Sequence, residues 1–131
     1  MAFNYNVLIK ENALLNAAGA SKKEISSAMT TLKVEFADDY LDFLMKVGAC
    51  IFRNHEIVGI SAFEDMNVTD VTLKAREYNP QVPSNLYVIE EPHFDDIFIW
   101  QDSSGAIYQT YPNQKPKKIA GSLTEYLGLS D

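Results

Sequence analysis

The stretch DDIFIWQDSSGAIYQTY (residues 95–111) decides the fold class of this chain of 131 residues. It holds two apolar and aromatic runs, at 97–100 and 106–111, separated by the polar sequence DSSG. Gly105 is free to take a positive-φ turn position, so the pattern predicts two antiparallel strands joined by a tight turn. Apolar side chains occur on both faces of these strands. We therefore expect helices to cover one face, and the N-terminal segment or a partner to cover the other.

Three more strands are predicted on the N-terminal side of this hairpin. Residues 86–89 (LYVI) form a short apolar run that resembles a buried strand. The apolar runs 50–52 and 57–60 flank a polar turn at 53–56, which suits a second hairpin.

Four segments have the apolar spacing or the capping pattern of helices. A serine is followed three residues later by a glutamate at Ser21 and at Ser122, and such capping boxes satisfy the first backbone N–H groups of a helix. We also expect Thr69 to cap a helix. The predicted helices span residues 21–33, 37–47, 69–78 and 122–127.

The order of these elements predicts an α+β fold. We expect a single domain in which a twisted antiparallel β-sheet is flanked by N-terminal helices and a short C-terminal helix. Residues 1–20 show poor periodicity and are expected to form an N-terminal arm, which leaves residues 21–131 as the domain.

The chain is acidic, with 18 Asp and Glu against 11 Lys and Arg and a net charge of −7. Residues 35–102 hold 14 acidic residues and four basic ones, which gives −10. Because phosphate backbones and anionic membranes are bound mainly through Lys and Arg, this balance argues against nucleic acid and membranes as direct ligands. The acidic charge is equally consistent with a solvated surface and with a surface that steers a basic partner. Asp38 and Asp39 are already explained by the helix dipole.

The sequence also bears on cellular location. Cys50 is the only cysteine, so an internal disulfide is excluded, and we expect it to be a buried, inert thiol. No stretch reaches the ~20 apolar residues needed to span a bilayer, and the first residues lack a signal-peptide pattern. We expect a cytoplasmic protein.

Four segments resemble the SUKH superfamily of Smi/Knr-type proteins, and especially its small bacterial members. They are VEFADDYLDFLMKVGA at 34–49, NLYVIEE at 85–91, DDIFIWQDSSGAIY at 95–108 and IAGSLTEYLGL at 119–129. The resemblance implies an α+β domain without a catalytic motif. For the bacterial members it implies an immunity protein, which binds and neutralises a cognate polymorphic toxin. Many of those toxins resemble nucleases or nucleic-acid deaminases.

Under this interpretation, carboxylates at strand ends and aromatic side chains would contact a basic toxin domain. We expect Trp100 to lie mainly in the core, with an interface role as the alternative, because sequence does not show which face of its strand is inward. The candidate partner-binding residues are Glu90, Glu91, Asp95, Asp96, Asp102, Trp100 and Tyr108.

Two other functions are supported by fewer features of the sequence. An enzyme or metal protein would use EEPHFDD (residues 90–96), but no second histidine lies nearby and no metal-binding motif is present, so we expect neither a metal nor a cofactor. His55 is expected in a turn rather than as a general base. A non-catalytic adaptor or regulatory scaffold of the Smi/Knr type remains the alternative, and the oligomeric state is open.

Overall fold

The computed structural model of the chain describes residues 3, 5–11 and 19–129. Within these residues the chain forms one α+β domain with five α-helices, one short 3-10 helix and six strands. In chain order the elements are α1 (Asn6–Lys10), α2 (Lys22–Leu32), α3 (Asp38–Lys46), β1 (Cys50–Phe52), β2 (His55–Ile57), η1 (Glu64–Met66), α4 (Val68–Tyr78), β3 (Tyr87–Glu90), β4 (Phe98–Gln101), β5 (Ile107–Thr110), β6 (Lys117–Ala120) and α5 (Leu123–Tyr126).

The strands form one antiparallel sheet in simple sequence order, from β1 to β6. The predicted central hairpin is confirmed: β4 pairs with β5, with Trp100 opposite Tyr108, and Gly105 takes φ 98° in the turn. Each strand pairs with the next along the chain; the connection from β2 to β3 is the long one, because it contains η1 and α4. The antiparallel sheet and its flanking helices confirm the predicted fold class.

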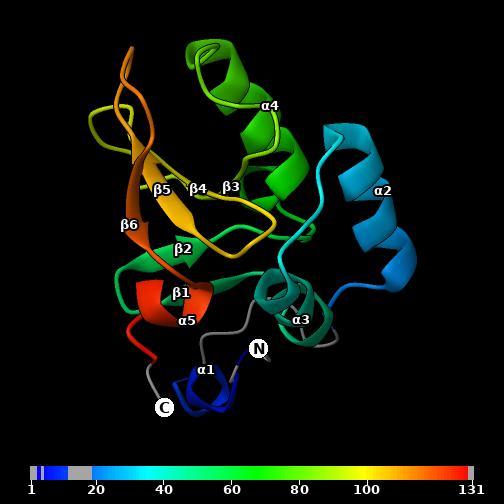
Figure 1. Cartoon of the computed structure of the whole chain (residues 1–131). Coiled ribbons are helices and arrows are strands. Elements are labelled where there is room, and N and C mark those ends of the chain that lie inside the picture. Colours follow the sequence, from blue (N-terminus) through cyan, green and yellow to red (C-terminus); the bar gives the residue numbers. More distant parts are fainter. Residues whose placement is uncertain (1–2, 4, 12–18, 130–131) are drawn as a thin grey trace.

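The helices pack in two groups around the sheet (Figure 1). Helices α2 and α4 lie side by side, and α4 also packs on β3. Helices α1, α3 and α5 gather near the β1–β2 hairpin (Figure 1). The capping box predicted at Ser21 is complete, because Ser21 Oγ accepts from Glu24 N–H and Glu24 Oε1 accepts from Ser21 N–H.

Both faces of β4 are buried, which answers the question of which face is inward. Phe98 and Trp100 lie on one face and Ile99 on the other, and all three are in the core. Trp100 is fully buried and its Nε1 donates to Thr110 Oγ1 at 2.8 Å. The expected core position of Trp100 is confirmed, and this side chain offers no exposed surface to a partner.

Three local predictions were wrong. Strand β2 begins at His55, so the turn is limited to Arg53 and Asn54, with Arg53 at φ 54°. Helix α4 begins at Val68 and Thr69 lies inside it; the preceding Asn67 is held by hydrogen bonds with the backbone of Ser61. Strand β6 had no counterpart in the prediction, because KKIA has no alternating pattern and pairs only through β5.

The described part of the N-terminal arm packs on the domain. Phe3 and Leu8 are buried in the common core, and the Phe3 ring meets Phe43 edge-on at 5.4 Å. Glu11 forms an ion pair with Arg53 at 3.0 Å. Helix α1 is therefore part of the packed structure, while the boundary at residue 20 stays a prediction.

Candidate functional site

The loop between β3 and β4, residues 91–97, has an unusual backbone. His93, Asp95 and Asp96 all have positive φ, at 65°, 53° and 54°. This region is uncommon for residues other than glycine, although Asp and His tolerate it better than most. Residues held in such conformations cluster at functional sites. Between them, Phe94 is 59% exposed, which is high for a phenylalanine.

Glu90, at the end of β3, is a buried carboxylate with three hydrogen-bond donors. Its Oε1 accepts from His55 Nδ1 at 2.9 Å and from the Tyr126 hydroxyl at 2.5 Å, and its Oε2 accepts from the backbone N–H of Glu56 at 2.7 Å. Burial, followed by the adjacent Glu90 charge, raises the pKa of the Tyr126 phenol well above its usual value. The three side chains come from β2, β3 and α5, so only the folded chain brings them together.

This network forms part of the wall of a cavity of about 300 Å³, which we call the Glu90 groove. The groove is lined chiefly by His55, Glu90, Phe94, Ile99, Tyr111 and Tyr126. A second hollow of about 310 Å³ adjoins it, shares His55, Glu90 and Phe94, and is bounded further by Ile51, Arg53, Glu56 and Glu91.

Large apolar side chains are exposed around both hollows. Phe94 is 59% exposed, Tyr111 is 44% exposed, and Ile51 in the edge strand β1 is also exposed. Two other aromatic side chains of these strands, Tyr87 and Phe98, are buried in the core. Exposed apolar side chains that border a concave surface mark an interaction site more often than singly scattered ones do.

Carboxylates surround the groove on the loop side. Asp95 and Asp96 are exposed, and Glu91 is held by Lys74 of α4 at 2.8 Å. Glu56 lies 3.8 Å from His93 Nε2. Glu91, Asp95 and Asp96 thus lie in the one loop that joins β3 to β4, as exposed or partly exposed side chains, whereas Glu90 lies inward.

Asp102 and Tyr108 lie at the other end of the strands. Because β3 and β4 are antiparallel and Tyr87 pairs with Gln101, Asp102 follows β4 where β3 begins, away from the 91–97 loop. Asp102 accepts from Ser104 and from the Tyr108 hydroxyl at 3.0 Å. Partial burial raises the pKa of Asp102, but these hydrogen bonds together outweigh it and hold the pKa below its usual value. This pair is separate from the groove.

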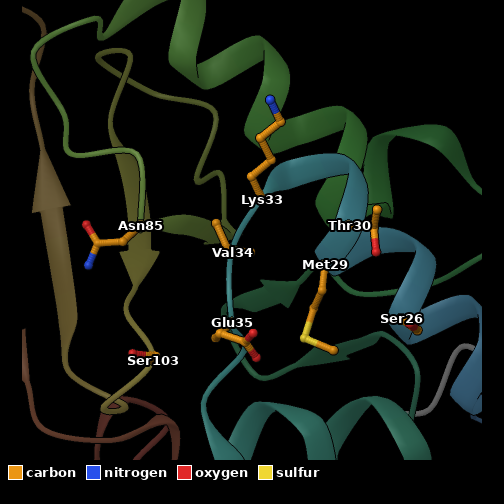
Figure 2. Close-up of a pocket in the computed structure, with 8 residues that line it drawn as sticks. All are labelled: Ser26, Met29, Thr30, Lys33, Val34, Glu35, Asn85 and Ser103. Atoms are coloured by element: carbon orange, nitrogen blue, oxygen red, sulfur yellow. The ribbon is translucent and has the colours of Figure 1, made fainter.

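A larger hollow, of about 470 Å³, lies elsewhere, between α2 and the connections around β3 and β4 (Figure 2). Half of its lining residues carry a hydroxyl or an amide, namely Ser26, Thr30, Asn85 and Ser103. Lys33 turns its ammonium away from the other side chains of the hollow (Figure 2). It brings together no exposed aromatic side chains, and we regard the Glu90 groove as the candidate site.

Residues 90–96 do not converge as ligands. In the described part of the chain, no group of three or more His, Cys, Asp or Glu side chains is placed to hold a metal ion. Cys50 is fully buried, as predicted, and burial raises the pKa of its thiol to about 12. None of the described helices has the length and apolar character needed to cross a membrane.

Comparison with protein families places most of the chain in a known family. The family model SUKH_6, described as SMI1-KNR4 cell-wall, matches residues 22–127. This chain belongs to the SMI1-KNR4 family. The predicted membership in the SUKH superfamily is thereby confirmed, over nearly the same residues as the segments that resemble it. No curated protein matches the chain.

The Glu90 groove lies within the SMI1-KNR4 domain, because its lining residues run from Asn54 to Tyr126. Sequence reasoning missed two of its central residues, His55 and Tyr126. The sequence pattern places His55 in a turn, and it does not single out Tyr126 within the last helix. No local pattern marks either as a partner of Glu90, since 35 residues separate His55 from Glu90 and 36 separate Glu90 from Tyr126.

Proposed function

We propose that this SMI1-KNR4 protein is an immunity protein that acts in the cytoplasm without catalysis. It binds a cognate polymorphic toxin, of a basic nuclease type, and covers the toxin's substrate site. The observation that carries the proposal is the Glu90 groove, where Phe94 and Tyr111 are exposed beside the acidic loop that contains Asp95 and Asp96.

The charges of this surface suit a basic partner. A nuclease presents a basic cleft to its substrate phosphates, so carboxylates placed there compete with nucleic acid and accelerate association by electrostatic steering. Lys74, near the loop, is already paired with Glu91, and Arg53 is paired with Glu11. These two cations therefore do little to cancel the charge of Asp95 and Asp96.

The aromatic side chains supply the short-range part of the binding energy. Aromatic residues dominate many interfaces when a partner desolvates them fully. The hydrogen bonds from His55, Glu56 and Tyr126 to Glu90 hold β2, β3 and α5 together beneath them. A rigid floor lowers the entropy that is lost when the partner binds.

The same residues support binding rather than catalysis. A His–Glu pair can act as a general base, but it then needs a nucleophile or a bound water beside it. Apart from the six residues named above, the groove is lined by Asn54, Pro92, Ile97 and Gln109, and none of these is an activated hydroxyl, thiol or amine. Cys50 is fully buried.

The test is co-expression with the product of the gene next to its own, followed by co-purification and by measurement of cell survival. We expect a stable complex and survival of cells that the neighbouring protein alone kills. Failure to bind that protein, together with recovery of an unrelated enzyme complex, would favour the adaptor alternative and contradict the proposal.

A charge variant tests the surface. Asp95→Asn with Asp96→Asn removes two charges and keeps residues that tolerate positive φ. We expect the association rate with the toxin to fall about threefold to tenfold at low salt, with a smaller difference at high salt. The matched control is Asp65→Asn with Glu77→Gln, which removes two exposed charges from η1 and α4. Equal rates for the two double variants would exclude the 91–97 loop as the steering surface.

A further inference from the structure

The Glu90 groove has walls and a floor of different chemistry. Two exposed aromatic side chains, Phe94 and Tyr111, line it together with the side chain of Glu90, a residue that is only 3% exposed. We propose that the groove receives one arginine side chain of the protein partner, with its guanidinium against the rings of Phe94 and Tyr111 and close to the carboxylate. This inference rests on the proposed function, because it names the group by which the toxin is anchored.

The floor of the groove favours a cation. Glu90 is a carboxylate in a region of low dielectric, where a charge acts more strongly than in water. Since a carboxylate only accepts hydrogen bonds, His55 donates to it from Nδ1 at 2.9 Å. Asn54 and Gln109 also line the groove, and their side-chain amide oxygens are able to accept hydrogen bonds. The groove therefore matches a group rich in N–H donors.

The walls favour a guanidinium over an ammonium. Arginine presents a flat, delocalised and weakly hydrated cation that stacks on aromatic faces, while the lysine ammonium is compact and strongly hydrated. Phe94 and Tyr111 line the groove and are both largely exposed, so their faces are accessible to such a group. The size also fits, because about 300 Å³ is at the lower end of ligand cavities and suits one side chain better than a larger molecule.

Cations of this chain do not occupy the groove in the described structure. No Lys or Arg is among its lining residues. The adjacent Arg53 reaches only the neighbouring hollow, where it pairs with Glu11 at 3.0 Å and lies over the Phe52 ring at 4.6 Å. Arg53 shows that this fold already holds one guanidinium against an aromatic ring and a carboxylate, a short distance along the same surface.

The test uses a pentapeptide with one arginine, acetyl-Gly-Gly-Arg-Gly-Gly-amide, and matched peptides in which lysine or neutral citrulline replaces the arginine. Binding to the full chain is followed by two-dimensional NMR. We expect the arginine peptide to shift the backbone amide signals of residues 54–56, 91, 93, 94 and 109–111. We expect affinity about fivefold or more weaker for the citrulline peptide and intermediate for the lysine peptide.

A matched pair of variants assigns the site. Phe94→Ala removes a groove wall, and Phe63→Ala removes a phenylalanine that is also 59% exposed but lies outside the groove. We expect Phe94→Ala to weaken arginine-peptide binding at least about threefold and Phe63→Ala to leave it unchanged. Glu90→Gln should also weaken binding of the arginine peptide. Because that variant removes a buried charge and can unfold, the comparison of Phe94→Ala with Phe63→Ala is the one that tests the site.

The outcomes separate this inference from the proposed function. Equal binding of the arginine and citrulline peptides, or equal effects of Phe94→Ala and Phe63→Ala, overturns the arginine site. If the neighbouring toxin still binds in that case, the immunity function stands without it. Selective arginine binding that depends on Phe94, with no complex with the toxin, supports the groove chemistry and contradicts the proposed function.

Discussion

Glu90 and Glu91 are adjacent carboxylates that the fold uses differently. Glu90 is buried and accepts hydrogen bonds from His55, Glu56 and Tyr126. Glu91 pairs with the half-exposed Lys74 of α4. Both were predicted to contact a partner directly. The structure places Glu90 beneath the surface and leaves Glu91 partly exposed.

We predict that Glu90→Ala lowers the free energy of unfolding by about 2 to 4 kcal/mol, because it leaves three donors without their buried acceptor. Glu91→Ala is the control, since loss of a partly exposed ion pair costs less than about 1 kcal/mol. Urea denaturation followed by tryptophan fluorescence measures both. Equal losses in the two variants would contradict the assigned role of Glu90.

At the scale of elements, Asp39 joins helix α3 to two other parts of the fold. Its Oδ1 accepts from Gln101 Nε2 at 3.0 Å, at the end of β4, and its Oδ2 accepts from the backbone N–H of Leu123 at 2.8 Å, at the start of α5. The neighbouring Asp38 is exposed. Both were explained by the helix dipole, which acts equally on them, and only Asp39 has the additional structural role.

We predict that Asp39→Asn lowers the free energy of unfolding by about 2 kcal/mol, because one amide cannot accept from both Gln101 and Leu123 without placing its own N–H₂ against a donor. Asp38→Asn is the control, because it keeps the first turn of α3. It should change the free energy of unfolding by less than about 0.5 kcal/mol. Thermal and urea unfolding of the two variants provide the comparison. A larger loss of stability in Asp38→Asn than in Asp39→Asn would contradict the structural role assigned to Asp39.

Across the whole molecule, several buried groups keep their protons. Burial raises the pKa of the Cys50 thiol from 9.0 to about 12 and raises the pKa values of the Tyr40, Tyr87 and Tyr126 phenols further. In the unfolded chain these groups release protons at their ordinary, lower pKa values. Unfolding therefore releases protons at high pH, and the native state is progressively disfavoured as the pH rises.

We predict that the free energy of unfolding is nearly constant between pH 7 and about 8.5 and falls steadily from about pH 9 towards pH 12. Urea unfolding in matched buffers measures the slope. Cys50→Ala removes the group with the lowest of these pKa values, so its slope should be shallower near pH 9 to 10. A slope that is unchanged by Cys50→Ala would show that the thiol is not the group responsible.

The burial of the Cys50 thiol can also be tested by its rate of alkylation. Because the thiol is buried and protonated at neutral pH, it should react with an alkylating reagent only when the fold opens. We expect alkylation at pH 8 to be much slower in the native protein than in urea. Rapid alkylation of the native protein would place the thiol on an accessible surface.

Much of the fold was predictable because its determinants are local. The Ser21–Glu24 capping box and the DSSG turn each act within a few residues, and every strand pairs with a sequence neighbour. Strand β6 was missed because its sequence has no alternating pattern and its pairing depends on β5. The His55 and Thr69 positions were wrong by one or two residues, since pairing and turn hydrogen bonds set those boundaries.

By itself, the sequence determined the α+β class, the antiparallel hairpins, the SMI1-KNR4 resemblance and the acidic character, because these depend on composition and on short-range spacing. Only the tertiary structure decided that Glu90 and Trp100 are buried, that Asp39 differs from Asp38, and that Asp102 lies away from the 91–97 loop. It alone assembled the Glu90 groove from β2, β3, α5 and the strand ends. The physical reason is that burial and long-range hydrogen bonds depend on which distant segments meet, and local spacing does not carry that information.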